Sequence, residues 1–109
     1  MAKTKIDLAA DSNGNAVQVL GPSTNVSGTA GATHSEIALP SDIQEGDVVR
    51  VYCEVDTYLE FGQTGVEAGT SSMIHPAGVE FYKVQTDVSY LGVERVGTAD
   101  GKVSCTLMK

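Results

Sequence analysis

The chain has 109 residues, 41% of them hydrophobic and 19% charged, which is the composition of one globular domain with a single core. Fourteen acidic residues against seven basic ones give a formal net charge of -7, so we expect no nucleic-acid partner. No run approaches the ~18 apolar residues that a membrane span needs, and the N-terminus lacks the apolar stretch of a secretory signal. We therefore expect no membrane partner and synthesis in a cytoplasm.

The N-terminal third is expected to differ from the rest of the chain. Residues 3–10 and 16–20 are predicted to pair as strands across the Asn13-Gly14 turn in "DSNGN". Residues 21–34 are rich in Gly, Ser and Thr, which predicts a long loop or an extended arm. The sequence therefore divides into an N-terminal hairpin and flexible segment, residues 1–34, and a core, residues 35–109.

From residue 35 onward, apolar residues alternate with polar ones, the period of a β-strand. The side chains expected to share a strand face are Ile37 with Leu39; Val49, Val51, Cys53 and Val55; Leu59 with Phe61; Val79 with Phe81; Leu91 with Val93; and Val103, Cys105 and Leu107. Turns are expected at Gly46 and at Asp100-Gly101, where the last two strands would form a hairpin. The pattern predicts an all-β fold, a single antiparallel sandwich or small barrel of about seven to eight strands.

The two cysteines, Cys53 and Cys105, both fall in predicted strands. A reducing compartment would keep them as buried thiols, which is the outcome we expect. Their spacing alone leaves a disulfide open.

The stretch "GTSSMIHPAGVEFYKV" brings Ser71, Ser72 and His75 close together in sequence. A hydrolase nucleophile elbow has the pattern G-x-S-x-G before a helix, and "GTSSM" lacks both the second glycine and the helix. The predicted structure is a polar loop that turns near Gly78 and enters the strand of Val79. We expect no enzyme and no cofactor, and no metal site, because the histidines lie far apart and the cysteines lack C-x-x-C spacing.

A longer stretch resembles a known group of proteins. "DVVRVYCEVDTYLEFGQTGVEAGTSSMIHPAGVEFYKV", followed by "YLGVERVGTADGKVSCTLM", resembles small virion proteins of tailed bacteriophages, and among them head decoration (cement) proteins. The similarity covers residues 35–109. The "IHPAG" turn departs from the more usual apolar or Leu-Pro sequence at that place.

The resemblance implies a structural role. A decoration protein binds the outside of the major capsid protein and stabilises the head, so the implied location is the capsid surface, the implied partner is that capsid protein, and the implied oligomer is a homotrimer. The alternatives are a tail, adaptor or fibre module of the virion, or a glycan-binding module that stacks sugars on Tyr58 or Tyr82. The residues that we expect at a capsid or subunit interface are Val26, Thr29, Thr33, Tyr58, Ser72, Met73, Ile74, His75 and Tyr82.

Overall fold

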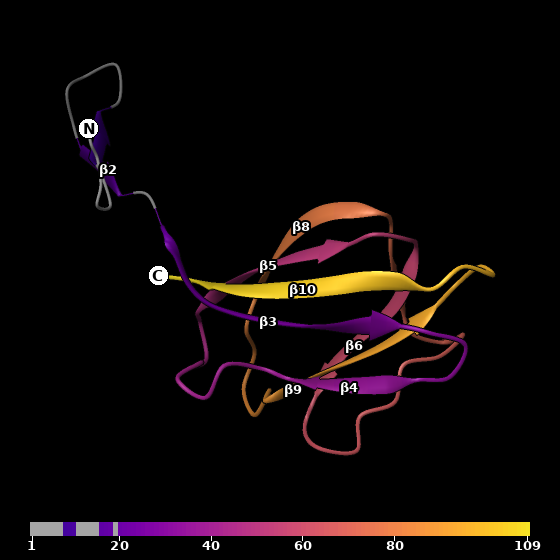
Figure 1. Ribbon diagram of the computed structural model, residues 1–109. Coiled ribbons are helices and arrows are strands. Elements are labelled where there is room, and N and C mark those ends of the chain that lie inside the picture. Colours follow the sequence, from indigo (N-terminus) through magenta and orange to yellow (C-terminus); the bar gives the residue numbers. More distant parts are fainter. Residues whose placement is uncertain (1–7, 11–15, 19) are drawn as a thin grey trace.

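The computed structural model describes residues 8–10, 16–18 and 20–109 (Figure 1). All elements within those ranges are strands, and no helix there has the length and apolarity needed to cross a membrane.

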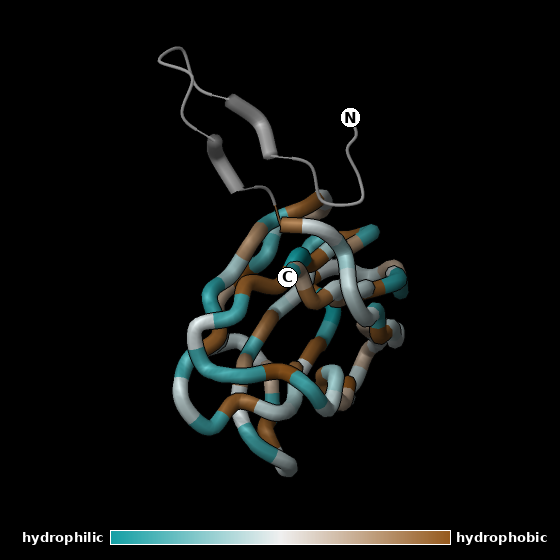
Figure 2. The backbone as a smooth tube through the Cα atoms, turned by 90° about the vertical axis from the view of Figure 1, so that its left-hand side faces the viewer, coloured by the Kyte–Doolittle hydropathy of each residue, from teal (hydrophilic) through white to brown (hydrophobic). Residues whose placement is uncertain are grey.

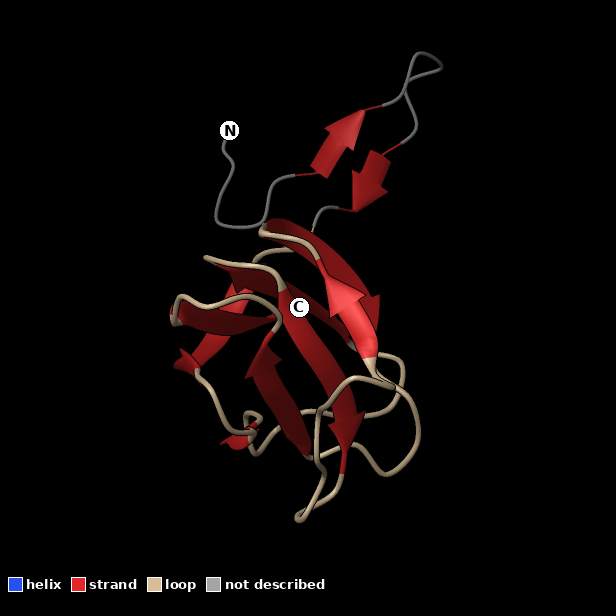
Figure 3. Ribbon diagram, turned by 90° about the vertical axis from the view of Figure 1, so that its right-hand side faces the viewer, coloured by secondary structure: helices blue, strands red, loops and turns tan. Residues whose placement is uncertain are grey.

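Eight strands form two four-stranded antiparallel sheets that pack face to face (Figures 1 and 3). The first sheet has the order β3-β10-β5-β8, built from β3 (Pro22–Ala30), β10 (Gly101–Met108), β5 (Val48–Cys53) and β8 (Gly78–Lys83). The second sheet has the order β4-β9-β6-β7, built from β4 (Ser35–Ala38), β9 (Tyr90–Arg95), β6 (Thr57–Gly62) and β7 (Met73–His75). The predicted all-β sandwich is confirmed.

The core lies between the sheets and consists of alternate residues on neighbouring strands. From the first sheet it takes Val49, Val51 and Cys53 of β5 and Val103, Cys105 and Leu107 of β10; from the second it takes Ile37, Leu59, Leu91 and Val93. Figure 2 shows the same alternation as short apolar and polar segments along the tube. Val79 and Phe81 do share a face as expected, but that face points to solvent, and Val84 of the same segment is buried instead.

The segment 21–34, expected to be a loop or an arm, contains β3, a nine-residue strand paired with β10. The prediction was wrong because the inward positions of β3 carry small side chains, which hide the period-2 pattern. A Cβ atom on Gly28 would lie 2.8 Å from Cγ1 of Ile37, so the neighbouring sheet leaves no room for a larger residue. The sandwich therefore begins well before residue 35. Gly21 already exchanges two backbone hydrogen bonds with Lys109, at 3.0 and 2.8 Å.

The last two strands do not form the expected hairpin, because β9 belongs to the second sheet and β10 to the first. The connection at residues 96–100 crosses the end of the sandwich. A turn signal such as Asp100-Gly101 predicts that the chain reverses, but it does not determine which sheet the next strand joins. Gly101 is required by packing, since a Cβ atom there would lie 2.5 Å from Cγ2 of Val55.

At the N-terminus, β1 (Leu8–Ala10) pairs antiparallel with β2 (Ala16–Gln18), as the sequence predicts. The expected turn at Asn13-Gly14 lies outside the described residues. Among the described strands, β1 and β2 pair only with each other, and they form a separate two-stranded sheet beyond one end of the sandwich (Figures 1 and 3). We refer to this pair as the N-terminal ribbon.

Removal of residues 1–20 should leave a stable sandwich, whereas removal of residues 1–34 should prevent folding. The longer deletion takes away β3, and with it the fully buried Ala30 and the ladder along β10. Thermal unfolding followed by circular dichroism distinguishes the two. We expect a cooperative transition close to that of the full chain for the shorter deletion and none for the longer one; two similar transitions would show that β3 is dispensable.

Candidate functional site

His75 is fully buried, and both nitrogen atoms of its ring are hydrogen-bonded. Its Nε2 lies 3.2 Å from the Gly78 carbonyl oxygen and its Nδ1 lies 2.7 Å from the Tyr82 hydroxyl oxygen. A carbonyl can only accept, so in the neutral ring Nε2 carries the proton and Nδ1 accepts from Tyr82. The pair joins β7 to β8, and therefore one sheet to the other.

The turn between β7 and β8 is stabilised by a hydrogen bond to Asp56 and contains a glycine with a positive φ angle. Asp56 accepts a hydrogen bond from the Ala77 backbone N–H at 2.9 Å, and Gly78 has a φ of 127°, which a residue with a side chain rarely adopts. Tyr82 also packs edge-on against Phe61, with ring centroids 5.4 Å apart. Tyr82 is thus partly buried against the core.

Ser72 is engaged elsewhere, in fastening residues 63–72 to the outer face of the second sheet. Its hydroxyl donates to Glu60 at 2.9 Å and accepts from the Gly69 N–H at 3.1 Å. A second carboxylate, Glu36, accepts from the Gly65 N–H. Ser72 and His75 therefore have separate partners. Residues 69–78 were expected to be a loop, but three of them, Met73–His75, form β7 and pair with β6.

Two strands at one side of the sandwich carry exposed apolar side chains. Met73 and Ile74 of β7 are 45% and 52% exposed, and Val79 and Phe81 of β8 are 39% and 58% exposed. Met73 and Ile74 were among the expected interface residues. Val79 and Phe81 were missed, although "GVEFYKV" has apolar residues at both alternate sets of positions, which is a signal for a strand covered on both faces.

The backbone of β8 is open along its outer edge. Val84 donates to the Asp47 carbonyl at 2.7 Å and accepts from the Gly46 N–H at 2.8 Å, so its backbone faces β5. Because successive residues of a strand alternate in direction, the N–H and C=O groups of Val79, Phe81 and Lys83 point away from β5. No described strand pairs with them, and the Lys83 carbonyl accepts a hydrogen bond from the Gln85 side chain at 3.4 Å. We call these backbone groups, with the side chains of Val79 and Phe81, the β8 edge.

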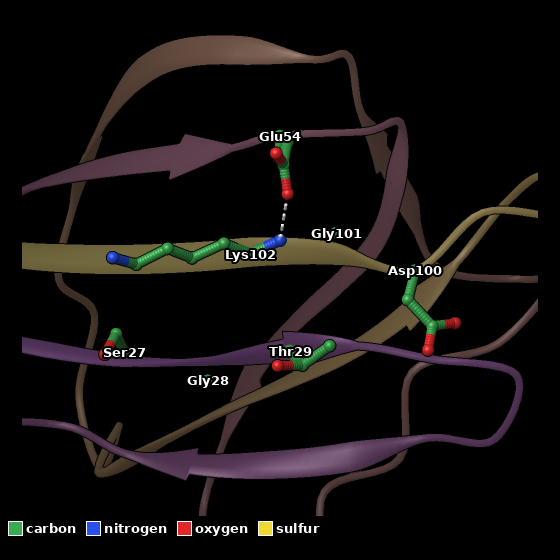
Figure 4. A pocket seen from close by; sticks show the side chains of 7 residues that line it. All are labelled: Ser27, Gly28, Thr29, Glu54, Asp100, Gly101 and Lys102. Carbon is green, nitrogen blue, oxygen red and sulfur yellow. Dashed lines mark hydrogen bonds between the residues drawn. The ribbon is translucent and has the colours of Figure 1, made fainter.

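A shallow groove of about 410 Å³ lies on the outer face of the first sheet, along β3 and β10 (Figure 4). Its lining residues are Ser27, Gly28, Thr29, Glu54, Asp100, Gly101 and Lys102. Figure 4 shows the Lys102 side chain running along β10 toward Ser27, away from the two carboxylates, and the Lys102 backbone N–H donates to Glu54 at 3.0 Å. Asp100 is ion-paired with Arg95. The two carboxylates are thus bonded to other groups of the chain, and the Lys102 side chain points away from both of them.

The expected interface residues fall into two separate regions. Tyr58, Ser72, Met73, Ile74, His75 and Tyr82 gather around β6, β7 and β8, with Tyr58 paired to Ile74. The other region lies at the opposite edge of the first sheet from β8, on β3 or just after it, and contains Val26, Thr29 and Thr33. Thr29 and Thr33 are exposed and Val26 packs partly against the core.

Both cysteines are buried free thiols on the inner face of the first sheet, as expected. They are diagonal neighbours, because Cys53 pairs with Val103 and Cys105 with Val51. Burial, with a smaller contribution from Cys53, raises the pKa of the Cys105 thiol to about 12. Among the described residues, no three His, Cys, Asp or Glu side chains are grouped to hold a metal ion.

Tyr82→Phe should lower the free energy of unfolding by about 1–3 kcal/mol, because it leaves Nδ1 of the buried His75 without its donor. Tyr58→Phe, on the outer face of the second sheet, is the matched control and should change it by a few tenths of that. Urea unfolding measures both, and equal effects would show that the His75–Tyr82 bond contributes nothing.

The Cys105 thiol should make stability fall in alkali. Burial raises the pKa of this thiol from 9.0 in the unfolded chain to about 12 in the folded one. Between these two values only the unfolded chain releases the proton. The stabilisation is therefore fully present below pH 9.0 and is lost as the pH rises from there toward about 12. The loss is at most about 1.4 kcal/mol per pH unit. Urea unfolding at several pH values in this range gives the free energy of unfolding as a function of pH. This free energy should fall less steeply with pH in Cys105→Val than in the unaltered chain, and equal slopes in the two would exclude this thiol as the cause.

Comparison with protein families, with curated proteins and with solved structures gives no match. The function proposed below therefore rests on the residues and geometry of this chain, together with the resemblance of residues 35–109 described above.

Proposed function

We propose that this protein is a structural component of a bacteriophage virion, a decoration protein that binds the outside of the major capsid protein and stabilises the head. The observation that carries the proposal is the division of the described chain into a two-sheet sandwich and a ribbon that pairs with neither sheet of that sandwich. The body supplies a rigid core. The ribbon supplies backbone groups that can pair with another chain.

The ribbon has the properties of an attachment element. Its strands are three residues each, and an isolated two-stranded hairpin of that size is marginally stable in water. It therefore gains most of its stability from whatever it pairs with. It is joined to the body at Gly21, whose two hydrogen bonds to Lys109 fix the point where the sandwich begins.

The exposed apolar side chains of β7 and β8 support the same role. Large apolar residues on an edge strand favour association with another chain, and many proteins avoid them there. A decoration protein uses such surfaces in its assembled state. Homotrimers at local three-fold positions of the shell are the assembly that we propose.

The direct test compares the full chain with residues 21–109 for binding to shells of the same phage's major capsid protein. Attachment through several linked contacts exceeds attachment through one by about 10²-fold or more, whether the ribbon contacts the shell or joins copies into a homotrimer, so we expect the shortened chain to lose that much apparent affinity. A full-length chain with the order of residues 1–20 scrambled is the control for length. Occupancy is read from cosedimentation with the shells and from cryo-EM maps of them.

Equal occupancy of the full and shortened chains would contradict an attachment role for the ribbon. Absence of binding by the full chain would contradict the capsid assignment. In that case, rings or stacks of purified protein in negative stain would support the alternative of a tail, adaptor or fibre module.

A further inference from the structure

We propose that the N-terminal ribbon of one copy adds as a further strand to the β8 edge of a second copy. The β8 edge, defined above by Val79, Phe81 and Lys83, offers N–H and C=O groups with which no described strand pairs, beside two exposed apolar side chains. The two described strands of the ribbon pair with each other and with neither sheet of the sandwich. Each surface thus supplies what the other lacks.

The ribbon cannot reach the β8 edge of its own chain. Gly21 is held at the β3–β10 side of the first sheet, and a strand added beyond β8 would lie four strand spacings from β3, about 19 Å away. Gln18, the end of β2, is only three residues from Gly21, a span of at most about 11 Å. β1 lies one spacing further out, at about 16 Å, and falls short as well. The pairing is therefore between copies.

Charge favours the ribbon over a second sandwich as the occupant of this edge. Residues 1–20 contain two lysines and two aspartates, so their side chains are neutral overall. Residues 21–109 contain five basic and twelve acidic residues, so the sandwich as a whole is acidic, while β8 itself carries one charge of each sign, Glu80 and Lys83. Two sandwiches that met edge to edge would bring like charges together, whereas the ribbon does not.

The lengths also agree. The three residues of β2 fit within the five positions from Val79 to Lys83. The exchange is head to tail, because the ribbon and the edge are different surfaces, and such contacts build a ring when the rotation between copies closes. This inference deepens the proposed function, since it assigns the ribbon's partner within the proposed homotrimer, but it does not depend on the capsid.

The test uses full-length chains in solution, with mass measured by sedimentation velocity. Val79→Lys/Phe81→Lys places charge on the β8 edge, and Val17→Pro disrupts β2 whichever of its edges faces the partner. We expect the unaltered chain to assemble and each variant to be monomeric. An equimolar mixture of the two variants should form a heterodimer, because one still has a ribbon and the other still has an edge.

The matched control is Ser27→Lys/Thr29→Lys, with the same charge change and the same spacing on β3, the opposite edge of the same sheet. It should assemble like the unaltered chain. If Val79→Lys/Phe81→Lys does not fold, Phe81→Pro takes its place in the test. Phe81→Pro removes an N–H that points to the open edge, and it removes no hydrogen bond between β8 and β5.

A monomeric unaltered chain at its highest soluble concentration would overturn the inference. So would assembly by the β8 variant, a mixture that stays monomeric, or loss of assembly in the β3 control. The proposed function fails separately: a chain that assembles in solution yet leaves capsid shells bare keeps the strand exchange and loses the capsid role. If the chain is monomeric in solution but loses shell occupancy when its ribbon is removed, the ribbon binds the capsid protein and not a second copy.

Discussion

The structure depends on the burial of two facing apolar surfaces, one from each sheet. β10 and β5 present alternating small and medium side chains inward, and β9 and β6 present leucines and valines against them. A strand has side chains on two faces, so this burial also fixes which residues face solvent. Removing apolar surface from water supplies about 25 cal/mol per Å², and no other favourable term in so small a domain is as large.

The same packing determines where small residues must stand. Gly28 of β3 lies where a Cβ atom would meet Ile37 of the facing sheet, and Gly101 of β10 lies where one would meet Val55 in the connection between β5 and β6. On the outer face of the second sheet, Gly92 leaves room for the backbone of Ala68, so that residues 63–72 lie flat against the strands. Each of these glycines is required because another segment of the chain occupies the space of a Cβ atom.

His75 and Ser72, which lie close together in the sequence, each make hydrogen bonds that connect parts of the fold. The ring of the buried His75 bonds to a tyrosine hydroxyl and a backbone carbonyl. Ser72 fastens a loop through Glu60. In both cases a buried or half-buried polar group is hydrogen-bonded because leaving it unpaired would cost about 1–3 kcal/mol.

The sequence by itself determined the fold class and most strands from Ile37 onward, since alternation of apolar residues is a local property that survives in any sandwich. It also indicated the ribbon pairing of β1 with β2 and the exposure of Met73 and Ile74. Only the tertiary structure decided that residues 22–30 are a strand, that β9 and β10 belong to different sheets, and that His75 bonds to Tyr82. The first two depend on how the sheets assemble: small inward side chains suffice on β3 only because Ile37 lies opposite, and a turn does not specify the sheet of the strand that follows it. The bond between His75 and Tyr82 joins residues close in sequence, but it forms because β7 and β8 belong to different sheets. The β8 edge was hidden for the same reason, because a strand's open edge is defined by which neighbours it has.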